Sequence, residues 1–253
     1  MSNIAKVIRI LCMVVIAALA AYSFFIEPGT VKVQRLGLHS DTAAKFVFLS
    51  DTHLPSANGV EVLRLVAKEK PDAVLFGGDG CDVQGPDCEN FFGNLSEIAP
   101  VYAVMGNHEY YGSKVPDATY LDNSKTVVAG VAICGVTHYG PKKAGGCDIS
   151  LVHSYANVEY ANGSRLVLAG HSHGGQVEIP FVTQTLLDAF LCRGCGTHRQ
   201  GEFSDSGART YVTSGTGSFF FRQLQAHLDA RFLHPPEIVV VELGQGEPRP
   251  AGK

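Results

Sequence analysis

Residues 46–53 read FVFLSDTH, four apolar residues followed closely by an aspartate and a histidine. A continuously apolar run of this length is typical of a strand that is covered on both faces of its sheet. Four more segments place polar residues after an apolar run: AVLFGGDGCD at 73–82, VYAVMGNHE at 101–109, ISLVHS at 149–154 and LVLAGHSH at 166–173. Because ligands of open α/β sheets bind beyond the carboxyl ends of the strands, we expect these polar residues to form one site.

The segments that join the first three runs have helical patterns. Residues 61–70 carry apolar side chains at helical spacing and are closed by Pro71, and a second helix is expected at 90–98. The resulting βαβαβ order predicts a mainly parallel sheet with helices on its faces. The later half contains more strands than helices, so we expect a second sheet packed on the first. The predicted fold class is a layered α/β sandwich, two packed mixed β-sheets flanked by helices. The other expected strands are 31–36 at a sheet edge, 127–134, 149–152, 166–169, 177–179, 210–213 and 238–241.

An uncharged apolar segment, ILCMVVIAALAAYSFFI, occupies residues 10–26. Its length approaches the roughly 20 residues that cross about 30 Å of hydrocarbon, so it is a membrane anchor or a secretory signal. A small-residue cleavage site is present at 18–20, but the apolar run continues beyond it to Ile26, which favours a retained transmembrane helix. We therefore predict a single-pass anchor at 1–28 and one globular domain at 29–253.

Charge and cysteine content limit the partners and the compartment. The net charge is −4, and no run of Lys or Arg provides the positive surface that nucleic acids require, so nucleic acid is not an expected partner. Cys12 lies in the anchor, and the other cysteines form local pairs at 81/88, 134/147 and 192/195. Such pairs form disulfides outside the cytosol, which favours an extracytoplasmic domain, although free thiols remain an alternative for 192/195.

The polar residues at the strand ends supply carboxylate, amide and imidazole ligands for two divalent cations. This mixture suits Mn, Fe or Zn better than Ca or a thiolate-bound metal. Two such ions about 3.5–4 Å apart neutralise a phosphoryl group and lower the pKa of a bridging water. A carboxylate usually bridges the pair, and Asp79 is the candidate. The sequence thus predicts a dinuclear metallohydrolase.

In order along the chain, DTH at 51–53, GDGCD at 78–82, GNHE at 106–109, His153 in LVHS and GHSH at 170–173 resemble the motifs of the calcineurin-like metallophosphoesterases. The resemblance covers about residues 45–243 and implies that 29–253 is a metallophosphoesterase domain. It also implies a set of metal ligands: Asp51, His53 and His173 for the first ion, Asp79 as the bridge, and Asn107, His153 and His171 for the second. His108 would assist the leaving oxygen, and Asp82 would orient the ring of His108. An adjacent carboxylate keeps a histidine protonated for general-acid work.

A finer resemblance lies in GHSHGGQVEIPF at 170–181, YVTSGTGS at 211–218 and PPEIVVVEL at 235–243. These segments are similar to a membrane-anchored bacterial subgroup, some members of which cleave the pyrophosphate of a UDP-diacylglucosamine. The resemblance implies that a metal-bridging hydroxide attacks a phosphoester or pyrophosphate bond of a phosphorylated small-molecule or lipid substrate. Two alternatives remain open: a non-catalytic metal-binding scaffold of the same fold, and a secreted soluble phosphatase whose signal is cleaved.

Other conspicuous residues are expected to have ordinary roles. Histidines 39, 138, 198, 227 and 234 have no motif around them, and surface or packing roles are expected, with His138 closest in sequence pattern to a site residue. The aromatic run Phe219–Phe221 is expected to be core or an apolar lip beside the membrane.

Overall fold

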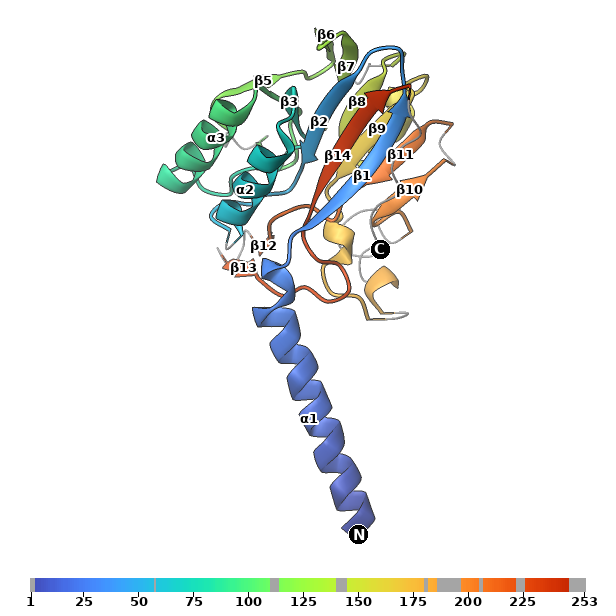
Figure 1. The fold of residues 1–253 in the computed structure, drawn as a ribbon. Coiled ribbons are helices and arrows are strands. Elements are labelled where there is room, and N and C mark those ends of the chain that lie inside the picture. Colours follow the sequence, from blue (N-terminus) through green and yellow to red (C-terminus); the bar gives the residue numbers. More distant parts are fainter. Residues whose placement is uncertain are drawn as a thin grey trace.

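The structure is a computed structural model that describes residues 3–56, 58–109, 114–139, 145–179, 182–185, 197–204, 207–221 and 226–245, with 219–221 and 226–228 described as backbone. Two six-stranded sheets packed face to face form the body of the domain (Figure 1). The first sheet has the order β1 (Lys32–His39), β14 (Glu237–Gly244), β2 (Ala44–Leu49), β3 (Ala73–Phe76), β4 (Val101–Ala103) and β5 (Ala118–Tyr120). The second has the order β10 (Gly201–Phe203), β11 (Arg209–Val212), β9 (Leu166–Gly170), β8 (Ile149–Ser154), β7 (Val131–Gly135) and β6 (Ser124–Val128).

Both sheets are mixed, as the sequence predicts. In the first, β2, β3, β4 and β5 are mutually parallel, whereas β14 is antiparallel to β2 and parallel to β1. In the second, β7, β8, β9 and β11 are parallel, and β6 and β10 are antiparallel edge strands. The predicted α/β sandwich of two mixed sheets with flanking helices is confirmed.

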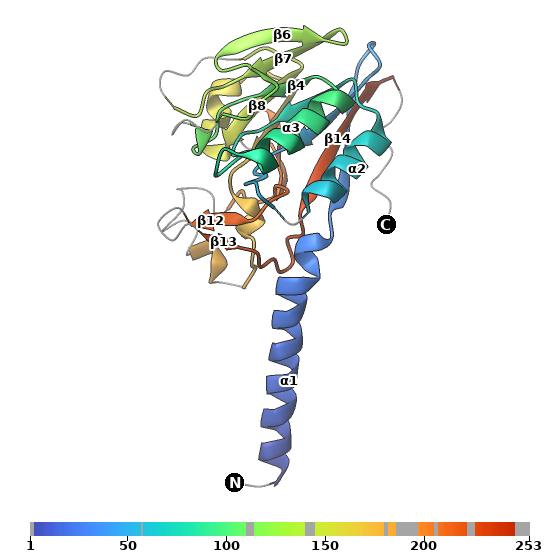
Figure 2. The same cartoon turned by 90° about the vertical axis from the view of Figure 1, so that its left-hand side faces the viewer.

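The alternation of side chains along β2 explains the layers. Phe46 and Phe48 point into the core between the two sheets, whereas Val47 and Leu49 point to the opposite face, where helices cover them. Those helices are α2 (Gly59–Glu69) and α3 (Pro86–Ile98), which lie on the outer face of the first sheet (Figure 2). A 3-10 helix, η3 (Tyr155–Ala161), packs on the outer face of the second sheet. Residues 46–49 of β2 and 73–76 of β3 are therefore buried on both faces of the sheet, which is why they read as continuous apolar runs.

Helix boundaries follow local sequence signals. The helix α3 begins at Pro86, four residues before the predicted start, because proline at the first helical position has no N–H to lose to a helical bond. The helix α2 ends at Glu69, since Lys70 adopts a left-handed conformation with φ 50° and Pro71 follows it.

Two predicted strands are wrong in detail. Residues 127–134 form two strands rather than one, because Ala129 and Gly130 adopt positive φ values of 49° and 77° and turn the chain into the β6–β7 hairpin. Residues 177–179 form no strand, and only isolated bridges join Val177 to Phe232 and Leu233. Three-residue strands β5 and β10, and the hairpin of β12 (Phe219–Phe221) with β13 (Ala226–Leu228), were not expected.

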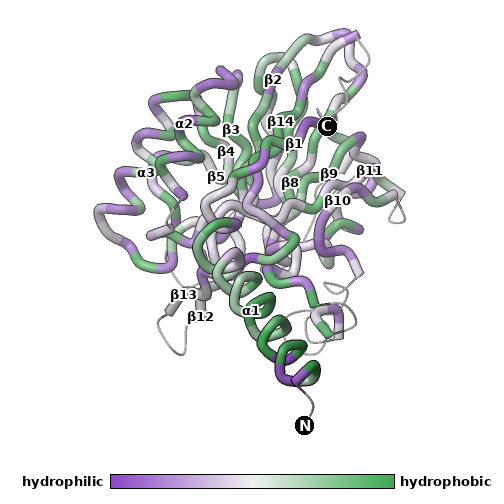
Figure 3. Tube along the Cα trace, turned by 60° about the horizontal axis from the view of Figure 1, so that its bottom comes forward, coloured by the Kyte–Doolittle hydropathy of each residue, from purple (hydrophilic) through white to green (hydrophobic). Residues whose placement is uncertain are grey.

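The N-terminal segment is one long helix, α1 (Asn3–Phe25), that projects away from the domain (Figure 1). It is long and apolar enough to cross a membrane, with a mean hydropathy of 2.4 over its most apolar window and none of that window buried. Figure 3 colours most residues of this helix as hydrophobic, apart from residues near its N-terminus. A short turn, η1 (Glu27–Gly29), connects it to β1.

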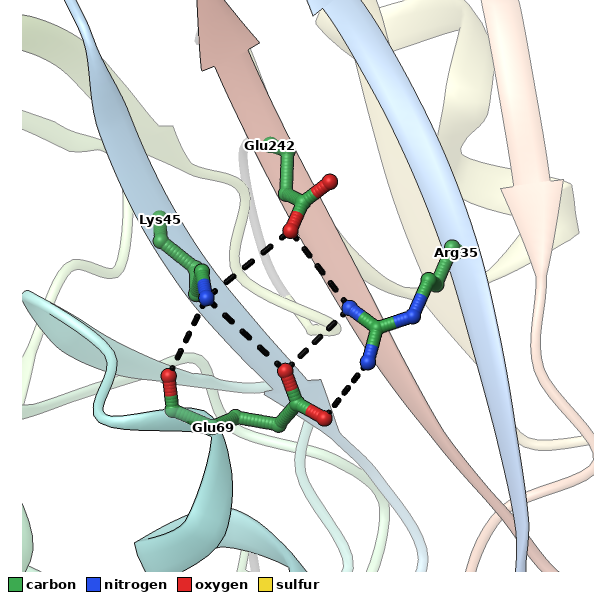
Figure 4. A pocket seen from close by; sticks show the side chains of 4 residues that line it. All are labelled: Arg35, Lys45, Glu69 and Glu242. Atoms are coloured by element: carbon green, nitrogen blue, oxygen red, sulfur yellow. Dashed lines mark hydrogen bonds and ion pairs between the residues drawn. The ribbon is translucent and has the colours of Figure 1, made fainter. Parts of the chain in front are cut away.

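A surface pocket on the first sheet is filled by its own ion pairs (Figure 4). Arg35 on β1 lies 2.6 Å from Glu69 at the end of α2 and 3.4 Å from Glu242 on β14. Lys45 on β2 lies 3.9 Å and 3.8 Å from the same two carboxylates. Two cations and two anions cancel, so this network joins α2 to three strands and leaves no net charge with which to attract an ionic ligand.

Two of the three cysteine pairs are disulfides in the structure. Cys81 is bonded to Cys88, and Cys134 is bonded to Cys147. The first bond joins the loop after β3 to α3, and the second joins β7 to the segment before β8. Cys12 on α1 is a free, exposed thiol, and the 192/195 pair lies outside the described residues.

Candidate metal centre

The predicted ligands lie in loops that follow the carboxyl ends of neighbouring strands. Asp51 and His53 follow β2, Asp79 follows β3, Asn107 follows β4, and His153 lies in β8, while the GHSH segment at 170–173 ends β9. Both sheets contribute, so the site lies where the ends of the two layers meet. The ligands from the first sheet lie at the α1 end of the domain. The strand β1 begins next to α1 and is parallel to β14, and β14 is antiparallel to β2, so β2 ends at the side where β1 begins.

Among the residues that the structure describes, three groups of side chains are close enough to hold a metal ion. Within each group the ligand atoms all lie within 4.8 Å of one another: Asp51 with His53 and His173, His53 with Asp79 and His108, and Asp79 with His153 and His171. Asp79 belongs to the second and third groups, and His53 links the second group to the first. The carboxylate of Asp79 therefore lies beside one ligand predicted for each ion, His53 and His153. All the predicted metal ligands in these groups come together in the fold.

The separations fit coordination better than hydrogen bonding. Asp79 Oδ2 is 3.4 Å from His153 Nε2 and 3.8 Å from His53 Nε2, and Asp51 Oδ1 is 3.7 Å from His173 Nε2. Two atoms that each lie about 2.0–2.2 Å from one ion are separated by roughly 3–3.7 Å. Asp51 Oδ1 and His53 Nε2 are buried and have no hydrogen-bond partner among the described residues. Buried polar atoms without partners are costly, and a cation between them removes that cost.

Asn107 adds an amide oxygen to the group of Asp79, His153 and His171. His153 Nε2 lies 3.0 Å from Asn107 Oδ1 and 3.1 Å from His171 Nδ1, so an amide oxygen and two imidazole nitrogens converge on one point. The other nitrogen of His153 lies 2.8 Å from the carbonyl oxygen of Gly77. This contact fixes the ring so that Nδ1 donates to the carbonyl and Nε2 is left as a lone-pair ligand.

Backbone strain is concentrated in the predicted ligands. Asp51, His53, Asp79, His171 and His173 all have positive φ values, between 43° and 73°. Such conformations are unfavourable for residues with a Cβ and persist where the surrounding structure over-determines them. The chain therefore turns sharply after β2, β3 and β9, which aims the side chains of these segments toward the site.

Asp82 contacts two histidines rather than the one that the sequence analysis assigned to it. Its Oδ1 lies 2.5 Å from Nδ1 of His108 and 2.9 Å from Nδ1 of His53. His108 turns its Nε2 toward the metal ligands, 3.9 Å from Asp79 Oδ2, and its side chain remains 12% exposed. One buried carboxylate thus orients both the predicted acid and a predicted metal ligand.

The electrostatics of the site divide its histidines into two kinds. Burial by itself lowers the pKa of both His53 and His153. For His53, the hydrogen bond and negative charge of Asp82 outweigh burial and raise the pKa to about 9. For His153, the negative charge and hydrogen bond of Asp79 do the same and raise the pKa to about 10. Burial and the charge of His153 lower the pKa of His171 to about 3. Burial and the charge of His53 also hold the pKa of His173 well below its ordinary value. The site therefore binds protons at two imidazoles where a metal would bind, and metal and protons compete.

Glu109 is a site residue that the sequence analysis quoted in its motif but gave no role. Its carboxylate is 2% exposed and accepts hydrogen bonds from the backbone N–H groups of Asp79, Gly80 and Gly106, at 2.7–2.8 Å. It thereby ties the loop after β4 to the loop after β3. The signal was its position directly after His108 in GNHE, but its partners are backbone atoms and leave no pattern in the sequence.

The same two loops pack too closely for a larger residue. A Cβ added to Gly106 would lie 2.2 Å from Oδ1 of Asp79. That oxygen also accepts a hydrogen bond of 2.8 Å from the backbone N–H of His108. Glycine at 106 is therefore required for the carboxylate of Asp79 to reach its position.

The histidines that are not predicted site residues lie in different surroundings. His138 lies beside the site, with ring centroids 5.0 Å from His153 and 5.9 Å from His171. His198 stacks on Tyr155, and His39 is exposed at the end of β1. His234 lies near Gln200 and Glu178, and the side chain of His227 is outside the described residues.

The profile of the calcineurin-like phosphoesterase superfamily domain matches residues 45–186. The chain is 29% identical to an uncharacterised metallophosphoesterase of Helicobacter pylori (strain J99) over 80% of this chain and 60% of that protein. It is 26% identical to the phosphodiesterase YaeI of Escherichia coli (strain K12) over 88% of this chain and 92% of that protein. It is 25% identical to a transmembrane protein with metallophosphoesterase domain of Danio rerio over 83% of this chain and 58% of that protein.

Proposed function

The chain belongs to the calcineurin-like phosphoesterase superfamily, and we propose that it is a dinuclear metal-dependent phosphoesterase anchored in a membrane. The observation that carries the proposal is the sharing of Asp79 between two groups of potential metal ligands. The names of the relatives, metallophosphoesterase and phosphodiesterase, support the same reaction class.

In this proposal the predicted ligands keep the roles that the sequence suggested. Asp51, His53 and His173 would hold the first ion, Asn107, His153 and His171 would hold the second, and Asp79 would be the ligand that both share. The distances and the buried unpartnered atoms described above support this assignment. Carboxylate, amide and imidazole ligands suit Mn, Fe or Zn.

Two divalent ions, when bound, supply charge neutralisation at the phosphoryl group and a hydroxide nucleophile near neutral pH. The chain itself supplies the proton for the leaving oxygen. His108 is the donor, because its Nε2 faces the ligands from a partly exposed position and its Nδ1 is held by Asp82. Asp82 fixes the orientation of the ring.

The proposed substrate is a phosphoester or pyrophosphate on a lipid or a nucleotide-sugar lipid, as in the UDP-diacylglucosamine pyrophosphohydrolase-like subgroup. The apolar helix α1 and the site at the α1 end of the domain support it, since both keep the reacting groups near a membrane. We further propose single-pass topology with the domain outside the cytoplasm, which the two disulfides support.

The test is hydrolysis by metal-stripped protein resupplied with Mn or Zn. The substrates are p-nitrophenyl phosphate, bis-p-nitrophenyl phosphate and a UDP-acylglucosamine, which separate monoesterase, diesterase and pyrophosphatase activities. His108→Ala is expected to abolish turnover and to retain metal. His39→Ala, which replaces an exposed histidine outside the site, is the matched control and is expected to behave as the unmodified protein.

The two alternatives predict different results. A non-catalytic scaffold would bind metal and hydrolyse none of the substrates. A secreted phosphatase would turn over soluble substrates from a chain that has lost α1, which intact-mass measurement of the membrane fraction detects. Metal-dependent turnover that survives His108→Ala would contradict the proposed role of that residue.

A further inference from the structure

We infer that the α1 end of the domain rests on the bilayer through an apolar patch that lies beside the metal centre. The patch consists of Phe25, Ile26, Ile179, Val182 and Leu233, and we call it the membrane-facing patch. The inference rests on the proposed span by α1 and is independent of the hydrolytic activity. Its partner is the lipid surface itself.

Only a short segment connects α1 to the first strand of the domain. The 23 residues of α1 rise about 34 Å at 1.5 Å per residue, which is close to the roughly 30 Å of a hydrocarbon core. The helix ends at Phe25 and the first strand begins at Lys32, with η1 between them. When α1 spans a bilayer, the domain therefore begins at the level of the lipid headgroups.

Hydrogen bonds then hold the domain in one orientation relative to α1. The backbone N–H of Arg231 donates to the carbonyl oxygen of Ser23 at 2.9 Å, within the last turn of the helix. The backbone N–H of Leu233 donates to the carboxylate of Glu27 at 3.1 Å, and Glu27 is 2% exposed. In the turn η1 that follows the helix, the carbonyl oxygen of Pro28 accepts a hydrogen bond of 3.3 Å from the side chain of Asn58. These contacts come from separate parts of the chain, so the domain cannot turn freely about its anchor.

The same contacts lead directly to the metal centre. The guanidinium of Arg231 is fully buried and donates to the carbonyl oxygens of Ser214 and Gly217. The backbone N–H of Gly217 donates to the carbonyl oxygen of Asp51 at 2.8 Å. Arg231 thus joins the end of α1 to the loop that carries a predicted ligand, and the orientation of the anchor is also the orientation of the site.

The apolar side chains of the domain at this end remain exposed. Ile179, Val182 and Leu233 are 52%, 46% and 60% exposed, and at the adjoining helix end Phe25 and Ile26 are 84% and 57% exposed. The two domain segments are joined to each other, since Val177 bridges to Leu233 and Glu178 donates to the carbonyl oxygen of Phe232. In Figures 1 and 2 the short helical turns of this region lie at the end from which α1 emerges. Apolar side chains at this level enter the boundary between headgroups and acyl chains.

The chain contains no tryptophan, so a single introduced indole reports on one position without background. Val182→Trp and Leu233→Trp each place an indole in the membrane-facing patch. Val127→Trp is the matched control, because Val127 is a 64% exposed valine on β6, at the end of the domain far from α1 (Figure 1). Leu11→Trp, in the middle of α1, reports on the insertion of the anchor.

The full chain is reconstituted into dioleoylphosphatidylcholine vesicles with and without doxyl-labelled phosphatidylcholine, which quenches indoles that touch lipid. We expect quenching at positions 182 and 233 at least twofold greater than at 127, and strong quenching at position 11. Quenching at 182 and 233 equal to that at 127, with position 11 quenched, overturns the inference. An unquenched position 11 overturns it as well, because α1 would not span. Hydrolysis of a soluble phosphodiester by the same variants is measured separately, so failure of the proposed activity is seen apart from failure of membrane contact.

Discussion

At the residue scale, Asp82 connects the proposed acid to the proposed metal ligands, because one oxygen contacts both His108 and His53. We expect Asp82→Asn to reduce turnover and also to weaken metal binding by about 10–100-fold, the usual effect of losing a partner that orients a metal ligand. His108→Ala is expected to reduce turnover alone. Titration calorimetry with Mn and steady-state hydrolysis separate the two effects, and an Asp82→Asn variant with unchanged affinity would contradict this reading.

The protonation of His53 and His153 predicts how metal binding depends on pH. Without metal, their pKa values of about 9 and about 10 keep both imidazoles charged at pH 7. Binding must then release about two protons, so the dissociation constant is expected to rise about 100-fold for each unit that the pH falls. Calorimetry in buffers of different ionisation enthalpy counts the protons, and a release near zero would refute the prediction.

The same shifts have a consequence for the metal-free fold. A histidine whose folded pKa is raised stabilises the folded state at pH values below its unfolded pKa of about 6.5. That contribution is lost as the pH rises through about 9 and about 10, the folded values of His53 and His153. These two residues therefore favour the metal-free fold most in mildly acidic solution, where metal binds least.

At the scale of elements, the bond between Cys134 and Cys147 closes a loop with a sequence separation of 13 and ties β7 to the segment before β8. By the loop-entropy estimate, Cys134→Ser with Cys147→Ser should lower the free energy of unfolding by about 3 kcal/mol. Cys12→Ser, on the exposed face of α1, is the control and should change it little. Urea unfolding of the oxidised proteins in detergent measures the difference, and equal midpoints and slopes for all three proteins would be the contrary result.

The elements that sequence reasoning predicted are those whose pattern reflects burial. The strands of the central layers carry apolar runs, such as 46–49 in β2 and 73–76 in β3, because both faces are covered there, and α2 carries a helical stripe for the same reason. The β6–β7 hairpin was read as one strand because its turn, Ala129–Gly130, carries a weak signal between two apolar arms. Strands of three residues, such as β5 and β10, are too short to have a pattern of their own.

The site was predictable to the extent that strand ends determine it. Parallel strands bring their carboxyl ends to one edge, so aspartates and histidines at those positions had to lie near one another. The second contact of Asp82 and the three backbone partners of Glu109 were not predictable, because they depend on how separate loops pack. The network of Arg231 was missed for the same reason, since its acceptors are backbone carbonyls far along the chain from the site motifs.

At the scale of the whole molecule, the fixed attachment of α1 to the domain predicts that hydrolysis of a lipid-embedded substrate depends on the distance between the site and the membrane. A flexible Gly-Ser insertion between Ile26 and Glu27 removes the fixed orientation while it leaves the site intact. Hydrolysis of a soluble phosphodiester should stay the same, whereas hydrolysis of a lipid-embedded substrate should fall roughly tenfold as the effective concentration falls. Vesicle and soluble assays of the same preparation make the comparison, and equal losses in both assays would show that the insertion had damaged the domain instead.

The position of β14 determines when the domain can fold during synthesis. This strand, Glu237–Gly244, lies between β1 and β2, which are neighbours in sequence but are separated by it in the sheet. The ribosome makes α1 before β14, so α1 can enter the membrane long before the first sheet can close. Until then β1 and β2 each present an unpaired edge, and a nascent chain truncated before residue 237 lacks the strand that unites them.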